Sequence, residues 1–199
     1  AESRYFCVSR ASSRDEFVYL GGFERCQSDF ALSRETFPFL TLELITAGRG
    51  VMELGERRIQ VAPGLCFCTG PNIRFRLESN SRDPLQKFFF VFGRDAFPTR
   101  AHPSELYPGC VYQGVDPLVL AKWSELILEE GLSPRGDCEA NVRALLEILT
   151  RKISSDAEES LPAQGTDALV ARALRVIDSD FQTLRSAQEL ADRIGVTPE

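Results

Sequence analysis

Short apolar runs separated by turn residues fill the chain from about residue 17 to residue 92. Gly-Glu at 55–56 stands between two such runs at hairpin spacing, and Pro-Gly at 63–64 and Gly-Pro-Asn at 70–72 break the chain again. Many short strands at close and regular spacing are typical of an antiparallel sandwich or barrel. The sequence therefore predicts a mainly β fold, with strands at 40–46, 50–54, 58–62, 65–69, 73–78 and 86–93.

Helical periodicity replaces the strand pattern after residue 115. Asp116-Pro117 is a typical cap followed by proline at the first helical position, and the apolar pattern continues over 118–130 until Gly131. A second helix is expected from about Asp137 to Ile153. Its apolar stripe is wide enough to pack against the barrel, against a partner chain, or against both.

The C-terminal part has the pattern of a small helical unit behind a linker. Residues 154–165 are polar and acidic and contain Pro and Gly, which is typical of a linker between domains. A helix is expected over 168–181, and Ser186 to Glu189 is a capping box that opens a further helix over 187–194. Thr197 then stands as the cap of another helix, whose remainder we expect to lie beyond the printed sequence.

Two stretches of sequence resemble the AraC family of bacterial transcription regulators. ALRVIDSDF followed by LRSAQELADRIGVTPE is similar to the start of the helix-turn-helix domain of that family. LELITAGRG, the hairpin and the turns that follow it resemble its cupin-like effector-binding barrel. The resemblance implies a barrel at 1–115, a helical dimerisation segment at 116–153, a linker at 154–165 and the start of an all-α helix-turn-helix domain at 166–199.

The resemblance also implies roles for these parts. The barrel would bind a small effector, and the helix after it would pair two protomers. Thr197 would cap the DNA-recognition helix, so we expect specific DNA binding only in a protein that continues through that helix. The residues expected to form the dimer contact are Val142, Leu145, Leu146 and Leu149.

Composition agrees with a sensor better than with a complete DNA-binding module. Lys and Arg number 23 against 29 Asp and Glu, a net charge of −6, whereas nucleic-acid modules are usually basic. The six cysteines form no CxxC pair, which indicates reduced thiols in a reducing compartment. No signal peptide is evident, and the longest apolar run, 88–92, is too short to span a bilayer. We expect a cytoplasmic protein without membrane partners.

Catalytic and metal-binding patterns are missing from the sequence. Enzymatic cupins bind a metal through histidines, but 50–64 contains none, and the single histidine of the chain, His102, stands in a loop-like segment. There is no Gly-x-Ser-x-Gly elbow and no phosphate-binding glycine loop. We expect no catalytic residue, no metal and no cofactor. A metal-free cupin enzyme, or an interaction protein with a filled barrel, remain the alternatives to a regulator.

The candidate effector-binding residues come from three strands. Alternation places Phe88 and Phe90 on one face of a doubly covered strand, where they are either core residues or part of an effector pocket. Glu43 is a polar candidate on another strand. Arg74 and Arg76 share a strand face that alternation assigns to solvent, whereas the resemblance to AraC-type barrels turns both toward the cavity. Inward guanidinium groups would imply an anionic effector.

Overall fold

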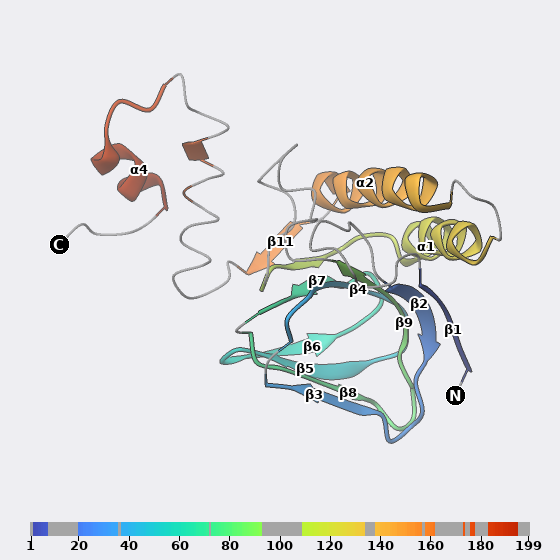
Figure 1. Ribbon diagram of the computed structural model, residues 1–199. Helices are drawn as coiled ribbons and strands as arrows, with labels where there is room; N and C mark the ends of the chain where they lie inside the picture. The colour runs from blue at the N-terminus through green and yellow to red at the C-terminus, as the bar shows by residue number, and fades with distance from the viewer. Residues whose placement is uncertain are drawn as a thin grey trace.

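The computed structural model describes residues 2–7, 20–35, 37–71, 73–92, 109–133, 138–156, 158–161, 173, 176–177 and 183–194 (Figure 1). Its strands are β1 (Glu2–Cys7), β2 (Leu20–Arg25), β3 (Ala31–Arg34), β4 (Leu40–Ala47), β5 (Gly50–Leu54), β6 (Arg57–Val61), β7 (Cys66–Thr69), β8 (Phe75–Ser79), β9 (Gln86–Phe92), β10 (Val111–Gln113) and β11 (Glu158–Leu161). Its helices are α1 (Pro117–Leu132), α2 (Cys138–Asp156) and α4 (Ala187–Ile194).

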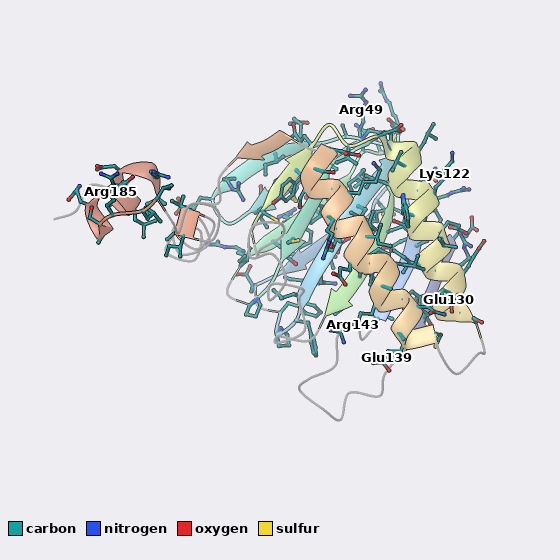
Figure 2. All side chains as sticks on the ribbon, turned by 90° about the horizontal axis from the view of Figure 1, so that it is seen from above. Arg49, Lys122, Glu130, Glu139, Arg143 and Arg185 are labelled. Atoms are coloured by element: carbon teal, nitrogen blue, oxygen red, sulfur yellow. The ribbon has the colours of Figure 1, made fainter. Side chains whose placement is uncertain are left out.

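Within these residues the strands form two antiparallel sheets that face each other. The larger sheet has the order β1-β2-β9-β4-β7-β10-β11, and the smaller has the order β3-β8-β5-β6. Helices α1 and α2 lie side by side across the outer face of the larger sheet (Figures 1 and 2). The predicted fold class, mainly antiparallel β with a few helices, is confirmed.

The turn residues place the strands where the sequence predicts them. The pair at 55–56 joins β5 to β6 as a hairpin, and Gly55 takes a φ of +62°, which glycine adopts without strain. Strand β1 lies before the predicted β region and was not predicted. Its side chains are mostly exposed, and only Phe6 is buried. An edge strand of this kind carries little apolar periodicity.

Strands β4 and β9 are buried on both faces, because each face of the larger sheet is covered. Leu42 lies beside Phe90 and Leu44 beside Phe88. These four side chains pack with α1 and α2 in what we call the helix-side core. The opposite face of the larger sheet packs against the smaller sheet in the inner core, which contains Ile45, Met52, Leu54, Ile59, Val61, Phe67, Phe75 and Leu77.

Helix α1 begins as predicted but does not end at the glycine. The Asp116 side chain accepts a hydrogen bond from the Leu118 N–H at 2.8 Å. The helix continues through Gly131 to Leu132. A Cβ at position 131 would lie 2.4 Å from Cγ of Phe6, so the glycine permits close packing of α1 on β1 instead of terminating the helix.

The apolar stripe of α2 is used inside the chain. Val142, Leu146 and Leu149 have no exposed surface, and Leu145 is partly buried against the same helix-side core. Asn141 of α2 also donates a hydrogen bond to Glu130 of α1 at 2.8 Å. The sheet and α1 therefore cover Val142, Leu146 and Leu149, which leaves Leu145 as the one of these four residues with exposed surface; the predicted dimer contact stays a prediction.

The predicted linker at 154–165 is partly regular structure. Helix α2 continues to Asp156, and β11 pairs antiparallel with β10. Strand pairing uses backbone groups, which a polar composition does not exclude. In the C-terminal part, Ser186 accepts from the Glu189 N–H as expected, whereas Glu189 accepts from the Arg185 N–H, one residue before the cap. Thr197 lies outside the described residues.

Candidate functional site

A buried ion pair lies on the inner face of the larger sheet. Glu43 of β4 and Lys87 of β9 are diagonal neighbours on adjacent strands, and Lys87 Nζ donates to Glu43 Oε2 at 2.8 Å. Only 2% of the Glu43 side chain and 3% of the Lys87 side chain are exposed. Both side chains point away from the helices, since they alternate with residues of the helix-side core.

Lys87 contacts a second carboxylate. Glu24 of β2 lies 3.3 Å from Lys87 Nζ and is 28% exposed. Burial by itself would lower the pKa of Lys87, but the attraction and hydrogen bond of Glu43, together with Glu24, outweigh this and raise it. The ammonium group is therefore charged at neutral pH and is shared between two carboxylates.

Aromatic and sulfur groups surround this ion pair. Lys87 Nζ lies 5.0 Å from the ring centroid of Phe89 and 5.8 Å from that of Phe30, within the range of a cation–π interaction. Burial raises the pKa of the nearby Cys26 thiol to about 12. A thiol of this kind is a poor nucleophile at neutral pH.

More polar groups face inward at the end of the barrel where β3 ends and β4 begins. Thr41 and Thr69, neighbours on β4 and β7, are buried and hydrogen-bond each other through their hydroxyl groups. Arg34, the last residue of β3, lies opposite the buried Phe75. Its guanidinium carbon lies 4.3 Å from the ring centroid of Phe37. Its Nη1 is buried and has no hydrogen-bond partner in the described part of the chain.

The predicted effector residues lie in different parts of the fold. Glu43 faces the interior, as an effector ligand in the barrel would. Phe88 and Phe90 belong to the helix-side core, which is the first of the two alternatives that the sequence left open for them. Alternation identified the two faces of β9, but both faces are apolar, and the pattern does not indicate which one the helices cover.

Arg74 and Arg76 are exposed, whereas Phe75 and Leu77 are buried between the sheets. Arg76 forms an ion pair with Glu78 on the outer surface of the smaller sheet. The inward orientation implied by the family resemblance is therefore wrong, and simple alternation describes this strand correctly.

Two inward charged residues, Lys87 and Arg34, were not among the predicted site residues. Lys87 precedes the apolar run of β9 and is indicated by alternation with Phe89, which shares its face. Arg34 lies on a short strand whose single large apolar residue, Leu32, gave little periodicity. The signal for both is a charged residue two positions from an apolar residue that faces the inner core.

A depression of about 610 Å³ that is open to solvent lies next to this region, and Cys26 belongs to both. It is lined by residues around the end of β2: Glu2, Arg25, Cys26, Gln27, Ser28 and Asp29. Across the described ranges, no three His, Cys, Asp or Glu side chains are grouped so that they could hold a metal ion. None of the described helices is both long and apolar enough to cross a membrane.

No curated protein matches the chain. Similar solved structures include the AraC-like transcriptional activator CuxR, at 15% identity and a TM-score of 0.47, where the match covers 89% of this chain and 66% of CuxR. A cupin 2 conserved barrel domain protein from Salinispora arenicola matches at 10% identity and a TM-score of 0.39, over 50% of this chain and 82% of that one. A cupin protein from Bacteroides fragilis matches at 12% identity and a TM-score of 0.33, over 39% and 68%.

The family model of the AraC-like ligand binding domain matches residues 17–166, which is three quarters of the chain. That stretch contains β2 to β11, α1 and α2, and so includes the smaller sheet, the larger sheet except β1, and the inward polar groups described above. The chain belongs to the AraC-like ligand binding domain family.

Proposed function

We propose that this chain is the ligand-sensing part of an AraC-type transcription regulator and that a small effector binds between its two sheets. The observation that carries the proposal is the family match over residues 17–166. The inner core adds support, because buried charges such as Glu43 and Lys87 are costly and are usually kept where they serve specificity or binding.

The effector site we propose is the end of the barrel where β4 begins. Small-molecule sites are mostly apolar and contain a few well-placed polar groups. Phe89 and Val91 supply apolar surface on the inner face, while Thr41 and Thr69 supply hydroxyl groups. Glu43 and Lys87 lie deeper along the same strands and hold β4 and β9 in register.

The regulatory part of the proposal concerns the dimer and DNA. We propose a cytoplasmic homodimer that binds DNA through a helix-turn-helix domain of which α4 is the first motif helix. The capping bond of Ser186 supports a stable start for α4. Because the α2 stripe is buried, a dimer contact would use apolar side chains that the helices expose, which are Leu118, Leu126, Leu132 and Ile148.

We propose a binding role for the barrel, not a catalytic one. Lys87 is engaged by Glu43 and Glu24, so it is not poised to act as a base. The raised pKa of Cys26 disfavours nucleophilic attack by its thiolate. Turnover of a compound that binds the barrel, followed by mass spectrometry, would contradict this part.

The test begins with a thermal-shift screen of sugars, amino acids and small organic acids on the purified chain. Affinity for each compound that raises the Tm is then measured on Thr69→Val and on the outer-face control Arg76→Gln. Loss of one hydrogen bond predicts about fivefold weaker binding for Thr69→Val, and Arg76→Gln should bind as the wild type does. Equal affinity in both variants would exclude an interior site.

Regulation is tested separately from binding. The chain is joined to an unrelated DNA-binding domain that requires dimerisation, and a reporter is followed in cells. A compound that binds the barrel should change reporter output, and Thr69→Val should shift the response to higher concentration. A reporter that is insensitive to every binding compound would refute the sensing role.

A further inference from the structure

Arg34 has an unusual environment for a charged residue. On β3 it follows Leu32 at two-residue spacing, and its strand neighbour Phe75 is fully buried in the inner core. The side chain therefore leaves the strand on the inner face of the smaller sheet. Ser33, between Leu32 and Arg34, is exposed on the other face.

The guanidinium group is held in place, but its Nη1 does not donate a hydrogen bond within the described part of the chain. The guanidinium carbon lies over the Phe37 ring, 4.3 Å from its centroid, and this cation–π contact holds the group without occupying an N–H donor. Nη1 is buried and lacks a hydrogen-bond partner among the residues that the structure describes. Buried polar groups are nearly always paired, so an unpaired donor in a native fold requires a reason.

The two inward cations differ in this respect. Lys87 has Glu43 at 2.8 Å and Glu24 at 3.3 Å, whereas the structure gives Nη1 of Arg34 no such acceptor. We propose that the missing acceptor is the effector, and that Arg34 binds the carboxylate of a small acid with an apolar body. This inference rests on the proposed function and adds the chemical class of the effector.

The neighbours of Arg34 indicate why the proposed effector has a carboxylate and an apolar body. A guanidinium group matches the two oxygens of a carboxylate as a fork of parallel hydrogen bonds. The inner-face neighbours of Arg34 are apolar: Phe75 lies beside it on β8, and Phe67 packs on Phe75 with ring centroids 5.5 Å apart. The hydroxyl groups of Thr41 and Thr69 at the same end can contact a polar substituent of the acid.

The first experiment measures the ligand-free protein. Arg34→Met keeps an unbranched apolar stem and removes the unpaired Nη1 donor, so it should raise the urea midpoint of unfolding. Arg76→Gln on the outer face should leave that midpoint within error of the wild type. A lower midpoint for Arg34→Met would assign Arg34 a structural role and overturn the proposal.

The second experiment measures binding with matched probes. Benzoate is compared with benzamide, and hexanoate with hexanamide, by thermal shift and calorimetry on the wild type, Arg34→Gln and Arg76→Gln. At least one acid should bind more tightly than its amide. That preference should fall by about tenfold or more in Arg34→Gln, as loss of a charge-assisted hydrogen bond implies, and persist in Arg76→Gln.

The outcomes separate this inference from the function on which it rests. No preference for either acid, or a preference that survives in Arg34→Gln, would overturn the role of Arg34. If neutral compounds then bind and Thr69→Val weakens them, the sensing function stands without an anionic effector. If acids bind with equal affinity to Thr69→Val, Arg34→Gln and the wild type, both proposals fail.

Discussion

Replacing Lys87 by Met should be among the most destabilising single changes in the barrel. Glu43 is 2% exposed, so without the ammonium group it would remain as a buried carboxylate with no counter-charge. At an effective dielectric constant of about 20, unit charges 2.8 Å apart attract by about 6 kcal/mol before desolvation is subtracted. Removing one partner of a buried ion pair costs about 3–5 kcal/mol in practice.

The two ends of the pair should respond unequally. Glu43→Leu leaves Lys87 with Glu24 at 3.3 Å, so it should cost less than Lys87→Met. The double variant Lys87→Met/Glu43→Leu removes both charges, and apolar replacement of a buried pair is neutral or stabilising. Its free energy of unfolding should therefore return to within about 1 kcal/mol of the wild type or exceed it.

Urea unfolding followed by circular dichroism measures these differences. With an m-value of about 2 kcal/mol per molar urea, Lys87→Met should lower the midpoint by roughly 1.5–2.5 M. Because the folded pKa of Lys87 is raised, its contribution is complete below the ordinary lysine pKa and is lost as pH rises through the raised value. A loss below about 1 kcal/mol for Lys87→Met, or a larger loss for Glu43→Leu, would refute the reasoning.

Two further predictions concern the thiols and Gly131. Burial raises the pKa of Cys26 to about 12 and also raises the pKa of Cys66 and Cys68. The thiols of the unfolded chain ionise first, so the free energy of unfolding should fall above about pH 8.5, by up to about 1.4 kcal/mol per pH unit for each thiol. Urea unfolding in the presence of a reductant at several pH values measures this fall. If Cys66→Ala loses stability with pH as steeply as the wild type does, the explanation is wrong. Gly131→Ala should cost about 1–3 kcal/mol despite better helix propensity, because its Cβ would lie 2.4 Å from the Phe6 ring. The same substitution in a Phe6→Leu background should cost less, and equal costs in both backgrounds would exclude the clash.

The sequence predicts where the strands and helices lie better than it predicts what their faces contact. Turn residues such as Gly55 locate the hairpins because few other residues adopt a positive φ. In contrast, Phe88 and Phe89 point to opposite faces that are both covered, and one apolar residue is as suitable for either face as another. The α2 stripe has the same ambiguity, since Leu149 could pack on a sheet or on a second helix with equal periodicity. Such choices depend on the packing of the whole chain.

Charged residues are more informative than apolar ones about the interior of this fold. Lys87 and Arg34 both face the inner core, yet one has two carboxylates beside it and the other has an unpaired donor. Removal of Lys87 leaves a buried carboxylate without its counter-charge and should destabilise the fold, whereas removal of Arg34 eliminates a buried donor without a partner and should stabilise the ligand-free protein. The opposite signs expected for Lys87→Met and Arg34→Met therefore separate a structural charge from a ligand-binding one. They do so in the same barrel, by the same unfolding assay, and before any effector has been identified.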